Sequence, residues 1–376
     1  MRYNVDAVRE KFPVTGNCLY LDSGHQSPLS VDVKAGIEQF LDESLNHAGP
    51  KSAWMARLEE VRAQVARFFG VSASEIAFTK NTSEGCNLIA NAYPFREGDN
   101  VLMLEGDHPN NTYAFLNIEK KGVEVRFVPM TERVNAETFR SVADERTRII
   151  SLSHITFHAG HKFDIESIAG FCKEQGILLM IDAMQSVGVT PMSLKEMGVS
   201  VMVCGSHKGL LVPQGLGIMY ISKEVTNLVP PFLAAASLEN PPADFIASRD
   251  NMALRAGAGS FEVGNYNLPT VTALGRAIEL IESVGVANIE SHLYDLGDRL
   301  LSHLDRMGID LVGPRSRDDR APHIYVIRLD ADKWLPYFTE NNVRVSPERD
   351  GIRVSFALFN TENDVDAFAS VVEKYL

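Results

Sequence analysis

Short apolar runs alternate with amphipathic stretches from residue 76 to residue 221, and this alternation constrains the fold more than any other feature. Apolar runs of about four to eight residues are typical of buried strands, and apolar positions recurring every three or four residues are typical of helices. Strands are predicted at 76–79, 100–104, 124–128, 148–153, 177–182, 199–204 and 217–221. Helices are predicted at 83–92, 111–121, 136–142 and 165–175, with a short one near 194–197. The pattern predicts an α/β fold with a mostly parallel sheet covered on both faces.

The segment that follows this alternation predicts a second, smaller α/β domain. Helices are expected at 31–45 and 54–69, and residues 1–30 are expected to be irregular apart from a short strand at 19–22. Further helices are predicted at 270–283, 287–307, 333–339 and 362–375, and strands at 323–329, 343–345 and 352–356. A chain of 376 residues is long enough for two domains. We place a large domain at 31–274 and a small C-terminal domain at 275–376. Residues 1–30 are expected to join the small domain.

Charge and composition exclude several classes of function. The formal net charge is −13 and no basic stripe is present, which argues against a nucleic-acid partner. No apolar run approaches the roughly 20 residues of a membrane-spanning helix, and residues 1–14 lack the apolar core of a signal peptide. We therefore expect a cytoplasmic protein without a membrane partner. The cysteines (Cys18, Cys86, Cys172 and Cys204) and the histidines show no metal-ligand spacing, so no metal site is predicted.

One lysine stands between two of the predicted strands. The strand at 199–204 runs into Gly205-Ser206-His207-Lys208-Gly209, and a glycine-containing loop leads to the strand at 217–221. A lysine is seldom buried unless it is paired or chemically used. A Schiff-base lysine needs low polarity around it and open backbone that a cofactor can approach. The alternative is a surface lysine in a turn, and this stretch alone does not decide between the two.

Hydroxyl and amide groups at two strand ends suit a phosphate. Thr82 and Ser83 stand where a strand turns into a helix, and the free N–H groups of a helix start bind anions. Ser206 and His207, next to Lys208, are further candidate phosphate donors. The alternative interpretation of Thr82 and Ser83 is an ordinary helix cap.

Groups at two other strand ends suit a flat, cationic ring. Asp182 ends an apolar strand, where a carboxylate needs a cationic partner, and a pyridinium nitrogen is such a partner. Gln185 would reach the phenolic oxygen of that ring, and the imidazole of His108 would stack on its face. The alternatives are an aspartate that caps the next loop and a solvated loop histidine.

The order of these motifs resembles the class V aminotransferase-like enzymes of pyridoxal phosphate. The motifs are Thr-Ser-Glu-Gly at 82–85, His-Pro-Asn-Asn at 108–111, Asp-Ala-Met-Gln at 182–185 and Gly-Ser-His-Lys-Gly at 205–209. The resemblance extends over nearly the whole chain, and it includes cysteine desulfurases, isopenicillin N epimerase-like proteins, kynureninases and cystine lyases. It implies the pyridoxal phosphate fold of type I, with the cofactor on Lys208.

The same resemblance implies the roles of the remaining residues. Asp182 would pair with the pyridine nitrogen, Gln185 would bond the phenolic oxygen, and His108 would stack on the ring. Thr82, Ser83, Ser206 and His207 would hold the phosphate. It further implies a homodimer with shared active sites, in which residues 261–267 complete the partner's phosphate site; Asn265 stands there where a Thr is common. Arg353 matches the arginine that binds the substrate carboxylate, for which a guanidinium fork is suited; the alternative is a surface arginine on an edge strand.

The chain departs from the family pattern in three places. Cysteine desulfurases carry a nucleophilic cysteine shortly before that arginine, and residues 344–351 contain none. Phe157 stands where many relatives have an Asn that contacts cofactor and substrate. Either His158 or His161 supplies the contact that this Asn would make, or both are solvated loop residues. His25 and Gln26 occupy a loop with small residues in many relatives, and they are candidates for contact with a polar substrate.

These observations lead to one functional hypothesis and two alternatives. We expect a pyridoxal phosphate enzyme acting on an amino acid through Lys208, epimerase-like or aminotransferase-like, and not a thiol-dependent cysteine desulfurase, because the desulfurase step requires a mobile thiolate. One alternative is a β-eliminating lyase on a cysteine-like or kynurenine-like amino acid. The other is a binding or regulatory protein that keeps the fold without turnover.

Overall fold

The computed structural model describes residues 3–131, 133–244 and 246–376, and a seven-stranded sheet lies at its centre. Its strands are β2 (Ile76–Thr79), β3 (Asn100–Leu104), β4 (Glu124–Val128), β5 (Thr147–Ser153), β6 (Leu178–Asp182), β7 (Val201–Gly205) and β8 (Gly217–Ile221). They are arranged in the order β2-β8-β7-β6-β5-β3-β4. Strands β3 to β7 are parallel, and β8 is antiparallel to both of its neighbours. The predicted α/β fold with a mostly parallel sheet is confirmed.

Helices cover both faces of this sheet, which explains why β2, β3, β6, β7 and β8 are buried along their whole length; in the edge strand β4 only Val128 is buried. α4 (Thr82–Ala92) packs on α5 (Pro109–Leu116), β7 and β8, while α7 (Ile165–Gln175) packs on β6 and on α6 (Ala136–Arg140). Successive side chains of a strand point to opposite faces. In β3, Val101 and Met103 accordingly belong to one buried cluster, and Leu102 and Leu104 to the other.

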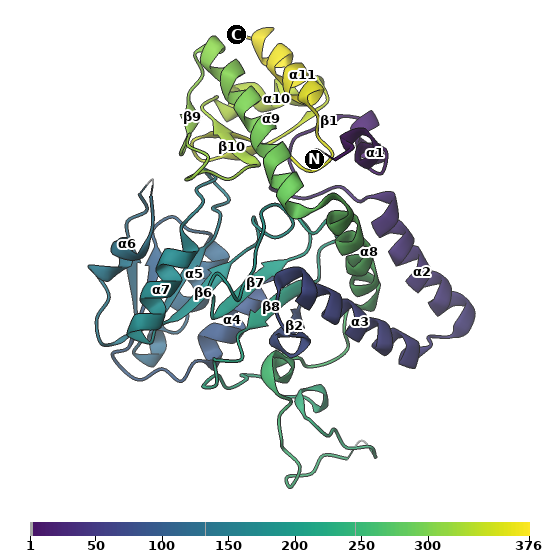
Figure 1. Cartoon of the computed structure of the whole chain (residues 1–376), viewed down its shortest axis with the longest axis vertical. Coiled ribbons are helices and arrows are strands. Elements are labelled where there is room, and N and C mark those ends of the chain that lie inside the picture. Colours follow the sequence, from purple (N-terminus) through teal and green to yellow (C-terminus); the bar gives the residue numbers. More distant parts are fainter. Residues whose placement is uncertain (1–2, 132, 245) are drawn as a thin grey trace.

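Three long helices stand beside the sheet. α2 (Val31–His47), α3 (Lys51–Phe69) and α8 (Leu268–Val284) pack on one another to the right of the sheet in Figure 1. The Ser30 hydroxyl caps α2 by accepting a hydrogen bond from the Val33 N–H. Gly70 ends α3 in the left-handed conformation, at φ 70°.

A second unit lies above the sheet in Figure 1 and contains both termini. It holds a four-stranded sheet in the order β12 (Ser346–Glu348), β13 (Gly351–Ser355), β10 (Ile324–Ile327) and β9 (Leu311–Val312). Helices α9 (Val286–Met307), α10 (Ala331–Glu340) and α11 (Glu362–Glu373) accompany it, and α1 (Val5–Arg9) lies nearby. β1 (Leu19–Tyr20) pairs in parallel with β11 (Val343–Arg344), so the N-terminal segment is tied to this unit. The division of domains at 275 stays a prediction, and that position lies inside α8.

Several predicted elements need correction. The helix expected near 194–197 is wrong: a hydrogen-bonded turn lies there, because Gly198, at φ 69°, ends the stretch after a single turn. The helix expected at 111–121 is divided into α5 and a 3₁₀ turn, Glu119–Lys121. The short elements α1, β9 and β12 were not predicted, because each is too short to show a period. Further 3₁₀ turns lie at Pro13–Gly16, Ala73–Glu75, Ala235–Ser237 and Gly257–Phe261.

No helix within the described ranges has the length and apolar character needed to cross a membrane.

Candidate functional site

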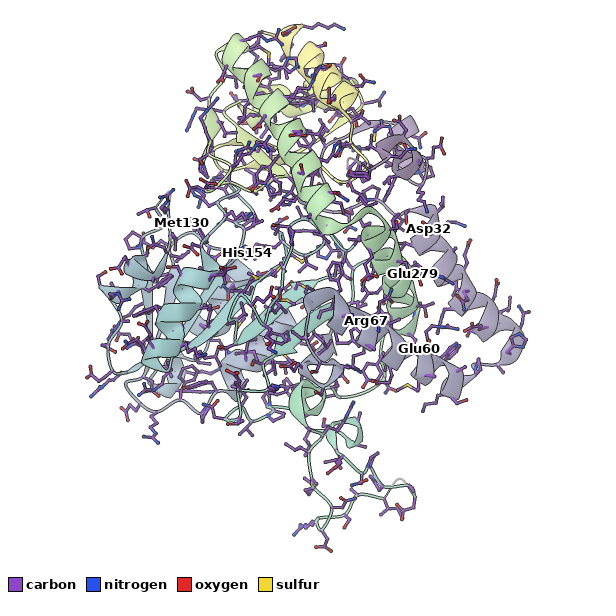
Figure 2. The ribbon with its side chains drawn as sticks, in the orientation of Figure 1. Asp32, Glu60, Arg67, Met130, His154 and Glu279 are labelled. Carbon is purple, nitrogen blue, oxygen red and sulfur yellow. The ribbon has the colours of Figure 1, made fainter. Side chains whose placement is uncertain are left out.

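The carboxyl ends of neighbouring parallel strands bring the predicted residues together. Asp182, the last residue of β6, lies beside Ser153, the last residue of β5. Lys208 follows the end of β7, the other neighbour of β6. His154, directly after Ser153, marks this edge of the sheet in Figure 2, below the small unit. Ligands of open α/β sheets bind beyond this edge of the strands.

A cavity of about 480 Å³ opens at this edge. Its size lies within the range of roughly 300–1,000 Å³ that small-molecule sites occupy. The predicted residues that line it are Thr82, Ser83, His108, Asp182, Gln185, His207 and Lys208. Thr82 and Asp182, which are 100 positions apart in the sequence, therefore line the same cavity.

Lys208 is half-buried at this cavity, and its amine has no hydrogen bond to any residue that the structure describes. Burial, together with the charge of Arg353, lowers the pKa of Lys208 to about 8, although the carboxylates of Asp182 and Glu348 act in the opposite direction. A larger share of the amine is therefore neutral at physiological pH than for an exposed lysine, and the neutral amine is the nucleophile. The residue after Lys208 is Gly209, and no larger residue fits at this position, because a Cβ there would lie 2.0 Å from the Val187 carbonyl oxygen.

Asp182 is 4% exposed, and one of its carboxylate oxygens, Oδ1, accepts a hydrogen bond of 2.9 Å from the Met184 N–H. Burial raises the pKa of Asp182 to about 7, and the neighbouring Asp107 adds to the rise, whereas Lys208 opposes it. A buried carboxylate at a cavity wall is stabilised by a cationic hydrogen-bond donor. The site therefore fits a ligand that presents a protonated ring nitrogen to Asp182.

Asp107, whose carboxylate the sequence motifs did not single out, contacts two residues of the cavity wall, Ser153 and His108. Its carboxylate is 7% exposed and accepts hydrogen bonds from the Ser153 N–H (2.8 Å), the Ser153 hydroxyl (2.6 Å) and the His108 N–H (2.6 Å). It thereby ties the loop after β3 to the end of β5. The His108 ring, which lines the cavity, meets the Phe157 ring edge-on, with centroids 4.9 Å apart.

The predicted phosphate donors are only partly brought together. Thr82 and Ser83 begin α4, where the helix N-terminus faces the cavity. The Ser206 hydroxyl instead donates to the Leu216 carbonyl oxygen (2.9 Å) and is completely buried, so it does not line the cavity. Asn265, at φ 49°, lines a second cavity of about 280 Å³, which shares Lys80 and Gly215 with the first.

Gln185 has a buried partner that sequence reasoning missed. Its amide nitrogen donates to the Gly24 carbonyl oxygen (2.9 Å), and its amide oxygen lies 3.4 Å from Nε2 of His323. Burial lowers the pKa of His323 to about 3, so this imidazole is neutral.

Of the predicted substrate contacts, His25 is exposed, and the Gln26 side chain accepts a hydrogen bond of 3.1 Å from Gln214, a cavity residue.

Arg353 lies behind the cavity wall and is not among the described lining residues. Its guanidinium is 4% exposed and is paired with Glu348 at 2.6 Å. Phe157, which lines the cavity, accepts a hydrogen bond of 3.0 Å from Arg353 through its carbonyl oxygen. His158 contacts Glu348 and Asp350, and the His161 N–H donates to the Thr156 hydroxyl.

The cysteines do not contribute to this cavity wall in the part of the chain that the structure describes. Cys86, Cys172 and Cys204 are buried, and burial raises the pKa of each thiol; Cys18 is half-buried. Among the described residues, no group of three or more His, Cys, Asp or Glu side chains is placed to hold a metal ion.

Known proteins resemble this chain along nearly its whole length. The family model described as aminotransferase class-V matches residues 19–368. An uncharacterized aminotransferase of Schizosaccharomyces pombe is 31% identical over 379 residues, covering 98% of this chain and 96% of the relative. A probable cysteine desulfurase of Methanothermobacter thermautotrophicus is 28% identical over 316 residues, covering 81% and 77%.

Solved structures agree with these matches. The apo structure of cysteine desulfurase from Thermococcus onnurineus NA1 superposes with a TM-score of 0.91 at 23% identity, covering 100% of this chain and 98% of that one. This likeness confirms the expected fold. The match of the family model over residues 19–368 confirms the family, and the chain belongs to the class-V aminotransferases.

Proposed function

We propose that this chain is a pyridoxal phosphate enzyme that acts on the amino group and Cα of an amino acid, in an epimerase-like or aminotransferase-like reaction without a catalytic thiol. Dependence on pyridoxal phosphate follows from the family. The observation that carries the assignment of the site is that the buried Asp182 and the half-buried Lys208 line one cavity.

The residues around the cavity fit the cofactor. Asp182 would hold the ring nitrogen, since its buried carboxylate fits a cationic donor, and Lys208 would hold the aldehyde carbon. The His108 ring would stack on the cofactor, and Gln185 would approach its phenolic oxygen. Thr82, Ser83, His207 and the N–H groups that begin α4 are placed for the phosphate, as a helix N-terminus favours an anion. The resemblance to the family also implies that Ser206 and Asn265 bind the phosphate. To do so, their side chains would have to turn toward the first cavity.

The bound cofactor supplies an electron sink that stabilises negative charge at the substrate Cα. Lys208 is the base in this proposal: its Nζ takes the proton from Cα and returns it. Delivery of a proton to the opposite face of Cα, by a donor other than Lys208, would give epimerisation, whereas protonation of the cofactor carbon in place of Cα would give transamination. Arg353 would bind the carboxylate, with His25 and Gln26 near the substrate side chain.

The absence of a thiol distinguishes this proposal from the reaction named in several relatives. The relative from Methanothermobacter thermautotrophicus is called a probable cysteine desulfurase. In this chain the hairpin of β12 and β13, which includes Arg353, carries Glu348 and no cysteine. The described cavity wall also contains no cysteine. These observations favour proton chemistry over sulfur transfer, with β-elimination as the alternative reaction.

We further propose a cytoplasmic homodimer in which residues 261–267 help to complete the phosphate site of the partner. This segment is held firmly: the buried Glu262 pairs with Arg62 at 2.6 Å and accepts hydrogen bonds from the Tyr266 hydroxyl and the Phe78 N–H. Sedimentation velocity measures the mass of the particle, and a monomer at micromolar concentration would contradict the dimer.

The reaction is tested by mixing the cofactor-loaded protein with a panel of L- and D-amino acids. The cofactor spectrum identifies the amino acids that react, and product analysis then separates the reactions. An inverted amino acid indicates epimerisation, a keto acid without free ammonia indicates transamination, and ammonia with a keto acid indicates elimination. A purified protein that is colourless and takes up no added cofactor would contradict the enzyme and favour a binding or regulatory protein.

A further inference from the structure

Arg353, the residue proposed to bind the substrate carboxylate, already binds a carboxylate of its own chain. Its Nη1 donates to Oε1 of Glu348 at 2.6 Å and to the Phe157 carbonyl oxygen at 3.0 Å. Its Nη2 lies 3.7 Å from Oδ1 of Asp22. One charged fork thus faces two carboxylates, and a third carboxylate from a substrate would meet repulsion from both.

The backbone fixes the Glu348 side chain in this position. β12, which carries Glu348, pairs antiparallel with β13, which carries Arg353, and Ser346 stands opposite Arg353 in this register. Glu348 pairs with Gly351 at the end of the same ladder, next to the turn. Both side chains are largely excluded from water, at 11% and 4% exposure, so their ion pair is only weakly screened.

Glu348 has a second partner that can keep its charge compensated. Its other oxygen, Oε2, lies 3.3 Å from Nδ1 of His158, and Nε2 of His158 lies 2.8 Å from Asp350. Loss of the contact with Arg353 therefore does not leave a buried carboxylate without a hydrogen-bonding group. A free buried carboxylate would be far more costly.

On the basis of the proposed function, in which Arg353 binds the substrate carboxylate, we propose that Glu348 is a specificity-determining residue that competes with that carboxylate for Arg353. In the free protein Glu348 occupies the guanidinium. A substrate carboxylate displaces Oε1 of Glu348, which stays beside His158. The substrate class is an α-amino acid whose remaining contacts offset this competition, and an amine without a carboxylate leaves the Glu348–Arg353 pair intact.

The test compares L-alanine with ethylamine, which has the amine but no carboxylate. Each is titrated into the cofactor-loaded protein, and the change in cofactor absorbance gives the half-saturating concentration. A hydrogen bond to a charged group contributes about 1.5–3 kcal/mol, so Glu348→Gln is expected to lower the half-saturating concentration of L-alanine by about tenfold or more. The value for ethylamine is expected to change by less than about twofold, because ethylamine does not bind Arg353.

The matched control is Glu340→Gln, which removes the same charge from an exposed position at the end of α10 and should alter neither titration. Glu348→Asp is the second variant if Glu348→Gln does not fold, because the shorter side chain keeps the charge but withdraws it from Arg353. It should also lower the half-saturating concentration of L-alanine. Three results would contradict the proposal. The half-saturating concentration of L-alanine could be equal in wild type and in both Glu348 variants, or that of ethylamine could fall by as much as that of L-alanine. The third such result is that L-alanine changes the cofactor absorbance of none of these proteins.

A measurement without cofactor separates failure of this proposal from failure of the proposed function. Propionate carries a carboxylate but no amine, and its binding to the cofactor-free protein is followed by the rise in Tm. The rise is expected to be larger in Glu348→Gln than in wild type and absent in Arg353→Ala. Equal rises in wild type and Glu348→Gln would overturn the competition even if the protein proves to be an active pyridoxal phosphate enzyme.

Discussion

The Asp182 carboxylate and the Lys208 amine line the same cavity, and burial shifts the pKa of each toward its neutral form. Burial raises the pKa of Asp182 to about 7 and lowers that of Lys208 to about 8. Each charge opposes the shift of the other, but does not cancel it. A ligand with a cationic ring and an aldehyde would suit both groups, because its ring nitrogen would donate to Asp182 and its aldehyde carbon would react with the neutral amine of Lys208.

Replacing Asp182 by Asn should stabilise the cofactor-free protein while it impairs the enzyme. The pKa of Asp182 is raised on folding from an ordinary value of 3.8 to about 7, so the stabilising protonated form is lost as the pH rises through 7. At pH 8 the buried carboxylate is charged, and Asp182→Asn should raise the free energy of unfolding by about 1–3 kcal/mol. Urea unfolding at pH 5 and pH 8 measures this, and the gain should be smaller at pH 5.

The same variant should lower kcat of the loaded enzyme by about 100-fold or more, since an electrostatic contact to the reacting system is removed. A cofactor-free protein that Asp182→Asn destabilises at pH 8, with unchanged kcat, would contradict this role of Asp182.

The rate of cofactor attachment should follow the protonation of Lys208. Only the neutral amine reacts, and the pKa of Lys208 is lowered from an ordinary value of 10.5 to about 8. The rate should therefore rise about tenfold per pH unit below pH 8 and level off above pH 8. For an exposed lysine the rate would continue to rise up to about pH 10. Rapid mixing of cofactor-free protein with pyridoxal phosphate measures the profile. In Asp182→Asn the midpoint should fall, because the Asp182 charge raises the pKa of Lys208.

Removing the Asp107 carboxylate should loosen the loop that carries His108. Asp107→Ala leaves the Ser153 N–H and the His108 N–H without their acceptor. An unsatisfied buried donor costs about 1–3 kcal/mol, and thermal or urea unfolding should show a loss of this size. Ser153→Ala removes only the hydroxyl donor and serves as the milder control. Equal stabilities of Asp107→Ala and wild type would contradict the role of this carboxylate.

Incubation with L-cysteine should produce no persulfide on the protein. Cys86, Cys172 and Cys204 are buried with raised thiol pKa values, and a buried neutral thiol does not attack a substrate sulfur. Cys18 is half-buried, so Cys18→Ser is the control variant and should retain its activity toward the amino acids that react. Mass spectrometry after alkylation detects a persulfide. A persulfide on any cysteine would contradict the proposed reaction without a catalytic thiol and would favour cysteine desulfurase activity.

Much of the fold could be predicted because the apolar pattern is local. The strands at 76–79, 100–104, 124–128 and 217–221 and the helix at 165–175 were predicted with the bounds that the structure has. Most of these elements bury apolar residues on both faces or along one face, a pattern that the sequence shows directly, whereas in 124–128 only Val128 is buried. The turn after Ser193 was predicted as a helix, because the apolar residues Leu194 and Met197 are three positions apart, a spacing that a single turn shares with a helix.

The candidate site could be predicted only where a residue follows a strand end. Thr82, His108, Asp182 and Lys208 each lie at such an end, and parallel strands bring these ends together. The partners that act across the chain left no local pattern. Asp107 binds Ser153, His323 lies beside Gln185, and Glu348 pairs with Arg353 only because the strands and loops that carry them are neighbours in space.

The central claim is that Lys208 is the residue to which the cofactor is attached, and chemical mapping tests it most directly. Sodium borohydride makes the link between lysine and pyridoxal phosphate permanent, and peptide mass spectrometry then locates the added mass. The neighbouring Lys80, which also lines the cavity, provides an internal comparison. We predict the mass on Lys208 alone, and its loss together with the cofactor colour in Lys208→Ala. Attachment at Lys80, or full labelling that persists elsewhere in Lys208→Ala, would contradict the account.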